Sequence, residues 1–278
     1  MRLGANLYGD CSTPEKWVAE LARKGYSAAF CPVGPEATDE TVAEYEQAAK
    51  ENGIVIAEVG AWSSPISRID EIREAGLKRC IEGLALAERI GANCCVNVAG
   101  SRGEPWFGHD PENLTEETFE LIVSTTQRII DEVNPTRATF TLETMEWMYP
   151  DSPESYARLV REIDRPAFAV HFDPTNLILS PHHYYRSTGI IEEFVAQLGP
   201  KIRSCHAKDI SMSHELTVHL DEVLPGQGNL DYPTFLKQID TLEPDVPLLI
   251  EHLTTEEEFD QAAKFIRETA ETCGVEIV

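Results

Sequence analysis

Apolar segments of strand length alternate with longer amphipathic stretches along the chain. Short apolar runs bounded by turn residues are typical of buried strands, whereas apolar residues repeated every three or four positions are typical of helices packed on a sheet. The pattern predicts eight strand–helix repeats. The strands are expected at Leu3–Leu7, Ala28–Pro32, Ile54–Val59, Cys94–Val98, Thr139–Glu143, Phe168–Asp173, Ile202–His206 and Pro247–Glu251.

Nearly all-apolar strands indicate a sheet that is buried on both faces, and such sheets are parallel and covered by helices. Eight repeats in 278 residues match a closed (β/α)8 barrel, which needs about 250 residues. No glycine-rich fingerprint follows the first strand, which disfavours an open sheet that binds dinucleotides. We therefore expect the α/β class, with a single TIM-barrel domain over residues 1–278.

Several helices have recognisable start signals. Thr13-Pro14 and Ser152-Pro153 each pair an N-cap residue with a proline at the first helical position. Thr254 followed by Glu257 predicts a capping box. Apolar residues spaced through residues 69–90 predict a long amphipathic helix.

One connection, residues 210–229, is unusually long and precedes a helix that is expected to begin near Asp231. Ordered loops longer than about 12–15 residues are commonly lids or binding segments. The turn Pro225–Gly228 within it has two interpretations: plain backbone geometry or a lid that contacts substrate.

Four predicted strands end on polar side chains, namely Glu143, Asp173, His206 and Glu251. The first two intervals, 173 − 143 = 30 and 206 − 173 = 33, are each about one strand–helix unit of roughly 31 residues. The third, 251 − 206 = 45, contains one unit and the long loop. Since the carboxyl ends of barrel strands meet at one mouth, these four side chains are expected to converge there.

Three carboxylates gathered without a cation would repel one another, and burying them unpaired is costly. A strand-end acid by itself is more often a helix cap or a solvated loop residue, but four in register predict a divalent metal site. Oxygen-rich ligands with one imidazole favour Mn²⁺ or Mg²⁺, with Co²⁺, Fe²⁺ or Zn²⁺ as alternatives. Such a site would retain about one negative charge, which suits a neutral polyol or hydroxycarbonyl compound.

The formal net charge of −25 disfavours binding to nucleic acids and anionic membranes. No apolar stretch approaches the roughly 20 residues of a membrane helix, and no signal-peptide core precedes the first strand. Seven cysteines without a Cys-x-x-Cys pair indicate a reducing compartment. We expect a cytoplasmic protein with a small-molecule sugar or polyol substrate; homo-oligomerisation is left open.

Five segments together resemble one known family. They are Thr141–Met145, Phe172–Leu177, Cys205–Asp209, Pro225–Tyr232 and Ile250–His252. As a set they are similar to the sugar phosphate isomerase/epimerase superfamily of xylose isomerase-like TIM barrels, over essentially the whole chain. In the similar ketohexose 3-epimerases, the matching Glu, Asp, His and Glu bind a divalent metal, usually Mn²⁺. The resemblance further implies that Glu143 and Glu251 are the catalytic pair that moves protons on opposite faces of the sugar.

Proton transfer from opposite faces gives epimerisation, and transfer between adjacent carbons through the same enediolate gives isomerisation. We therefore expect a divalent-metal-dependent isomerase or epimerase of a small sugar or polyol derivative in carbohydrate metabolism. One alternative is a metal-dependent dehydratase of a keto-inositol-like substrate, since inosose dehydratases share this architecture. Another is a non-catalytic polyol-binding barrel. A related three-zinc DNA-repair endonuclease is disfavoured by the acidic charge and the few strand-end histidines.

Three positions depart from the epimerase pattern. Asn176 replaces a His, Met212 replaces an Arg, and Tyr149 replaces a Glu. All three lie on the substrate side in those enzymes, so the identity of the substrate is not carried over.

Four further residues are candidates for substrate binding. Lys208 follows His206 by two positions and should face the same side, where it would hold an oxyanion or phosphate; the alternative is an external ion pair with Asp209 or a loop acid. Asn176 would bind a sugar hydroxyl or cap the next turn. Trp62 and Trp147 would form an apolar wall for a sugar ring, or pack under loops.

Overall fold

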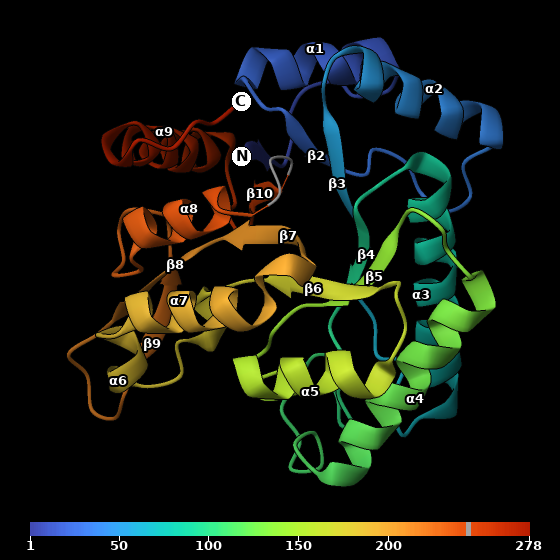
Figure 1. The fold of residues 1–278 in the computed structure, drawn as a ribbon, viewed down its shortest axis with the longest axis vertical. Coiled ribbons are helices and arrows are strands. Elements are labelled where there is room, and N and C mark those ends of the chain that lie inside the picture. The colour runs from blue at the N-terminus through green and yellow to red at the C-terminus, as the bar shows by residue number, and fades with distance from the viewer. Residues whose placement is uncertain (243–245) are drawn as a thin grey trace.

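The computed structural model describes residues 1–242 and 246–278. Eight parallel strands form a nearly closed (β/α)8 barrel, and the helices lie outside it (Figure 1). The barrel strands are β1 (Arg2–Ala5), β2 (Ala28–Phe30), β3 (Val55–Gly60), β4 (Cys94–Asn97), β5 (Thr139–Leu142), β6 (Phe168–Phe172), β7 (Ile202–Ala207) and β10 (Pro247–Ile250). The predicted fold class and all eight predicted strands are confirmed, with ends that differ by one or two residues.

The strand order is β1-β10-β7-β6-β5-β4-β3-β2, so the two ends of the sheet are consecutive in sequence. Between β1 and β2, the Ser27 amide donates to the Leu3 carbonyl over 3.1 Å. Gly4 permits this close approach, because a Cβ at that position would lie 2.3 Å from the Ala28 carbonyl oxygen. The barrel therefore closes where β1 has no side chain to hold β2 away.

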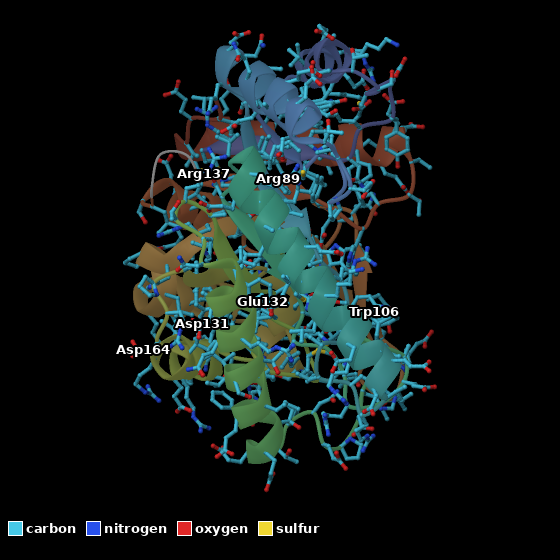
Figure 2. The ribbon with its side chains drawn as sticks, turned by 90° about the vertical axis from the view of Figure 1, so that its right-hand side faces the viewer. Arg89, Trp106, Asp131, Glu132, Arg137 and Asp164 are labelled. Atoms are coloured by element: carbon cyan, nitrogen blue, oxygen red, sulfur yellow. The ribbon has the colours of Figure 1, made fainter. Side chains whose placement is uncertain are left out.

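The outer layer consists of helices whose apolar faces pack on the strands. Figure 2 shows α3 and α4 crossing one side of the barrel. The helices are α1 (Pro14–Lys24), α2 (Asp39–Glu51), α3 (Asp70–Ile90), α4 (Glu116–Val133), α5 (Pro153–Ile163), α6 (Pro181–Tyr184), α7 (Ser187–Leu198), α8 (Tyr232–Asp240) and α9 (Glu256–Cys273), with short 3-10 turns η1 (Thr175–Leu177) and η2 (Gly199–Lys201).

The predicted start signals hold at two helices and are shifted at a third. The Thr13 hydroxyl caps α1, and Ser152 forms a capping box at α5. At α9 the cap is Thr255 with Glu258, one residue later than predicted. The segment from Thr254 onwards offers two equivalent registers, and Glu258 decides between them because its carboxylate also accepts from the Thr254 amide and hydroxyl, at 2.9 and 2.7 Å.

The long connection after β7 contains an antiparallel hairpin, formed by β8 (Asp209–Met212) and β9 (Leu220–Val223). The turn that follows is tied to the Asp209 carboxylate, which accepts from the amides of Gly226 and Gly228 at 2.9 and 3.0 Å. Helix α8 then begins at Tyr232, at the predicted position, and the structure shows that Asp231 is its cap. The connection thus contains regular structure and a turn that is anchored by side-chain contacts.

Two further sequence predictions can be compared with the fold. The seven cysteines are all free, and Cys94 and Cys95 are fully buried in β4. None of the helices in the described part of the chain has the length and apolar character that a membrane crossing requires.

At the amino-terminal ends of the strands, Glu88 joins the last turn of α3 to the start of β5. Its carboxylate accepts from the amides of Thr136, Arg137 and Ala138 at 2.9 to 3.0 Å. The Arg137 guanidinium donates to the Arg89 carbonyl in the same region (Figure 2). Although burial opposes the charge, these donors lower the pKa of Glu88 to about 2.

We expect Glu88→Gln to lower the free energy of unfolding by about 1–2 kcal/mol at pH 7, because one carboxylate oxygen becomes an amide donor facing other donors. Since the pKa of Glu88 is lower in the folded state, its contribution is present above the unfolded value near 4 and is lost as pH falls toward 2. Urea unfolding from pH 7 to 3 measures this difference. A gap between wild type and variant that stays constant down to pH 3 would contradict the assignment.

Candidate metal centre

The four predicted ligands converge at the carboxyl ends of neighbouring barrel strands. Glu143 directly follows β5, Asp173 follows β6, His206 lies on β7 and Glu251 follows β10. All four are buried, with exposed fractions of 0 to 9%. One ligand atom from each lies within 4.8 Å of the others. The structure therefore brings the predicted set together at one point.

The spacing within this cluster suits one small cation. His206 Nδ1 lies 3.0 Å from Glu143 Oε1 and 2.8 Å from Glu251 Oε1. Neighbouring ligands of a six-coordinate ion bound at about 2.1 Å are themselves about 3 Å apart. Asp173 Oδ2 and Glu251 Oε1 are buried without a hydrogen-bond partner among the described residues. The donor set and these two oxygens fit a divalent ion.

Lys208 is a second cation at the same cluster. Its Nζ lies 2.6 Å from Glu251 Oε1, 2.8 Å from Asp173 Oδ2 and 3.3 Å from Glu143 Oε1. The two shorter contacts are ion pairs to the same two oxygens that lack a hydrogen-bond partner. Lys208 faces the same side as His206 and does not pair with Asp209. With a divalent ion, the three carboxylates and Lys208 would sum to no net charge, so the sequence-based estimate of one residual negative charge omitted Lys208.

The charges in the cluster shift one another's proton affinity. Burial opposes ionisation of Glu143 and Glu251, but Lys208 and His206 outweigh it and hold the pKa of both carboxyls well below the usual range. Burial likewise opposes charge on His206, but Glu251, Glu58 and Glu143 raise the pKa of its imidazole well above normal. Asp173 differs, because burial together with the Glu143 charge raises its pKa to about 6.

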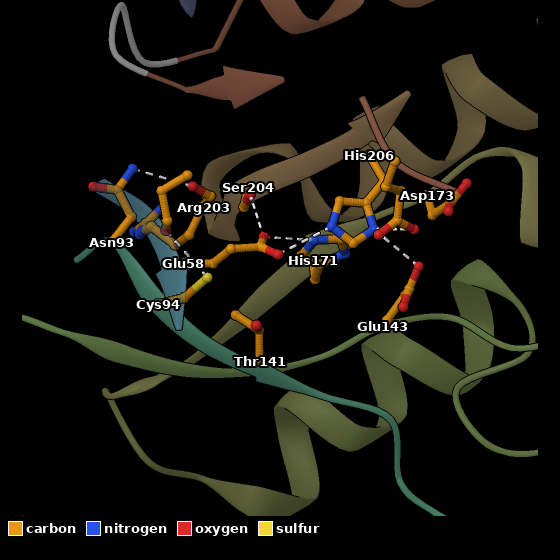
Figure 3. A network of polar contacts seen from close by, with 12 residues as sticks. Glu58, Asn93, Cys94, Thr141, Glu143, His171, Asp173, Arg203, Ser204 and His206 are labelled. Carbon is orange, nitrogen blue, oxygen red and sulfur yellow. Dashed lines mark hydrogen bonds and ion pairs between the residues drawn. The ribbon is translucent and has the colours of Figure 1, made fainter. Parts of the chain in front are cut away.

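A buried network behind His206 was not predicted from the sequence (Figure 3). Glu58 on β3 accepts from His206 Nε2 at 3.1 Å, from His171 Nε2 at 3.2 Å and from the Ser204 hydroxyl at 2.8 Å. The sequence did contain a signal for this network, because Glu58 is an acid inside an apolar strand and a buried carboxylate requires partners. The bond from Nε2 leaves His206 Nδ1 directed at the other three ligands.

A cavity of about 690 Å³ lies above the cluster, and Glu143, Lys208 and Glu251 form part of its floor. Asn176 also lines it and donates to Glu143 Oε1 at 3.3 Å and to the Thr144 carbonyl at 3.0 Å. The two candidate tryptophans, Trp62 and Trp147, line its wall. The sequence missed Trp106 and Phe107 in this wall because the loop that carries them has no strand-end position.

Residues 18–269 match a family model described as xylose isomerase-like TIM barrel. No curated protein sequence matches the chain. Among solved structures, a xylose isomerase-like TIM barrel protein from Mycobacterium smegmatis in complex with magnesium is 14% identical, with a TM-score of 0.69 and coverage of 98% of this chain and 97% of that one.

Two other solved structures are similar over nearly their full lengths. D-psicose 3-epimerase from Clostridium cellulolyticum H10, with D-tagatose, is 13% identical, with a TM-score of 0.70 and coverage of 99% and 100%. The probable 3-DHS dehydratase AsbF from Bacillus anthracis is 16% identical, with a TM-score of 0.69 and coverage of 97% and 98%. At these identities the likeness shows the fold alone. Because the family model spans most of the sequence, however, the chain belongs to the xylose isomerase-like TIM barrel family.

Proposed function

We propose that the protein is a divalent-metal-dependent isomerase or epimerase that acts on a small sugar or polyol derivative through an enediolate. The observation that carries the proposal is the convergence of Glu143, Asp173, His206 and Glu251 on one point at the floor of a cavity. The family and its epimerase and dehydratase neighbours support it. Mn²⁺ is the proposed ion, given three oxygen ligands and one nitrogen ligand.

The metal would be held by those four residues, and when bound it supplies Lewis-acid stabilisation of negative charge on substrate oxygens. Glu143 and Glu251 are then placed to move protons. The lowered pKa of both keeps them ionised at neutral pH, so that either accepts a proton from a carbon next to a carbonyl group. They approach the floor from β5 and β10, on either side of β7. One carboxylate removes the proton and the other returns one.

The neighbouring side chains orient this pair. Asn176 donates to Glu143 Oε1 and fixes that carboxylate, while Lys208 keeps positive charge against all three acids. The same lysine supports a second candidate function. Loss of water from a substrate requires a proton donor for the leaving hydroxyl, and an ammonium on the floor supplies one. A metal-dependent dehydratase of a keto-inositol-like compound is therefore the alternative.

Elemental analysis of the purified protein, followed by incubation with ketoses, aldoses and inosose-like ketones in heavy water, tests the proposal. We expect one divalent ion per chain and metal-dependent uptake of deuterium at carbon without loss of water. Loss of water from an inosose-like ketone would instead select the dehydratase. The absence of both a bound ion and any exchange would reject the proposal.

Glu251→Gln should lower the rate of deuterium exchange by about 10²- to 10⁴-fold, because the amide cannot accept the proton. The fold should remain, since Gln has nearly the same shape, and thermal unfolding checks this. Glu271→Gln, an exposed position on α9, is the matched control and should exchange at the wild-type rate. Normal exchange by Glu251→Gln would exclude Glu251 from proton transfer.

Glu58 is proposed as a positioning residue that acts through His206. Because its carboxylate holds Nε2, it fixes the ring nitrogen that faces the metal. Glu58→Gln should weaken Mn²⁺ binding by about 10- to 100-fold in calorimetric titrations. Ser204→Ala, which removes a different bond to the same carboxylate, should bind Mn²⁺ nearly as wild type does. A purely structural role would lower the unfolding temperature of Glu58→Gln and leave the Mn²⁺ affinity of the folded protein unchanged.

A further inference from the structure

The cavity lining carries acids in addition to the metal ligands. They are Glu146 and Glu222, whereas Lys208 is the only lysine or arginine among the described residues that line it. Lys208 is already committed to three carboxylates. The other basic group, His252, pairs with Glu222 at 3.0 Å. An anionic substituent on a substrate would therefore face Glu146 and Glu222 without a free lysine or arginine in the described lining to bind it.

The glycine-containing turn after the hairpin cannot act as a phosphate cradle. In TIM barrels, phosphate sites are commonly built from the loops after the seventh and eighth strands. Here the amides of Gly226, Gly228 and Leu230 already donate to Asp209 at 2.9 to 3.0 Å. A Cβ on Gly228 would lie 2.2 Å from Asp209 Oδ1, so the turn is shaped around that carboxylate.

The helix starts beside these loops are closed to anions as well. Asp231 caps α8 and accepts from the Thr234 amide at 3.1 Å. At α9, Glu258 accepts from the amides of Thr254 and Thr255. The first turn of that helix also contains Glu256 and Glu257. Carboxylates of the chain itself thus take the place that a phosphate group would need.

Aromatic side chains form much of the remaining lining of the cavity. Phe30, Trp62, Trp106, Phe107 and Trp147 all line it. Near the floor, the Trp62 ring centre lies 6.5 Å from that of His206. Towards the rim, Trp106 and Phe107 pack edge to face at 5.1 Å, and the Trp147 indole donates to the Phe107 carbonyl at 2.8 Å. Phe107 remains 45% exposed, so part of this aromatic wall is open to solvent.

We propose that the substrate is an uncharged glycoside, without phosphate or carboxylate, whose reacting sugar carries a ketone group and lies on the four ligands, and whose second ring or aglycone packs on the aromatic wall. The inference rests on the proposed function for the position of the reacting carbons. It goes further by excluding sugar phosphates and by requiring a substituent that reaches from the floor to the rim. Apolar ring faces against aromatic side chains supply the affinity for that substituent.

Calorimetric titration of the Mn²⁺-loaded protein with two matched pairs of compounds tests the proposal. D-fructose should bind at least about tenfold more tightly than D-fructose 6-phosphate, since the phosphate would face Glu146 and Glu222. Phenyl β-D-glucopyranoside should bind at least about tenfold more tightly than the methyl glycoside, since only the phenyl group reaches the wall. Equal or tighter binding of the phosphate, no gain from the phenyl group, or no binding of any compound would overturn the proposal.

Variants assign these preferences to the residues named. Glu146→Gln combined with Glu222→Gln should narrow the gap between fructose and its phosphate, whereas Glu117→Gln with Glu120→Gln on α4 removes the same charge far from the cavity and should leave the gap unchanged. Trp106→Ala and Phe107→Ala should each remove most of the gain from the phenyl group. Tyr185→Ala, at an aromatic residue that is 71% exposed and outside the cavity, should retain it.

Failure of the glycoside proposal can be distinguished from failure of the proposed function. Deuterium exchange that occurs only with phosphorylated sugars would keep the proposed isomerase and reject the glycoside. Tight binding of the phenyl glycoside without exchange of any compound would keep the glycoside and reject the isomerase.

Discussion

The burial of three carboxylates against one another is the constraint on which the centre of this protein depends. Glu143, Asp173 and Glu251 have exposed fractions of 5%, 0% and 9%, and each would be expensive to ionise without positive charge nearby. That charge comes from one strand and the residue that follows it. His206 and Lys208 project to the same side of β7, two residues apart, and β7 lies between β10 on one side and β6 and β5 on the other. The strand order therefore places both basic side chains among all three acids.

A second negative layer lies beneath the first. Glu58 reaches His206 from β3, across 148 residues of sequence, and its carboxylate is satisfied by two imidazoles and a hydroxyl. His206 is thus held between carboxylates on both ring nitrogens. Such a ring has little freedom to rotate, because rotation would break the bond between Nε2 and the buried Glu58 carboxylate. The orientation of the ligand is consequently set by the interior of the barrel and not by the loops at its mouth.

The sequence predicted the fold and the convergence of four side chains because both follow from periodicity. Strands of a barrel end at one mouth, so polar residues about one unit apart, such as Glu143 and Asp173, must meet there. The role of Glu58 was not predicted because this residue lies within a strand. Its partners there depend on the stagger between strands that are distant in sequence. The position of Trp106 in the cavity wall was not predicted because residues in loops have no regular spacing. Lys208 was expected near the site, but its contact with all three acids depends on side-chain geometry that spacing does not determine.

The turn Pro225–Gly228 illustrates why a motif needs its partners before it can be interpreted. Glycines that expose backbone amides are compatible with an anion site, yet here the anion is Asp209 of the same chain. The use of Asp209 as the anion in this turn has a structural consequence. By tying the turn to the start of β8, Asp209 fixes the hairpin beside the barrel, and Glu222 on β9 then pairs with His252, the residue after Glu251. The loop after β7 can hold a phosphate in other TIM barrels. Here it contacts the loop after β10 through Glu222 and His252, and Glu222 lines the cavity. The amides that bind Asp209 thus help to place Glu222, one of the acids that line the cavity.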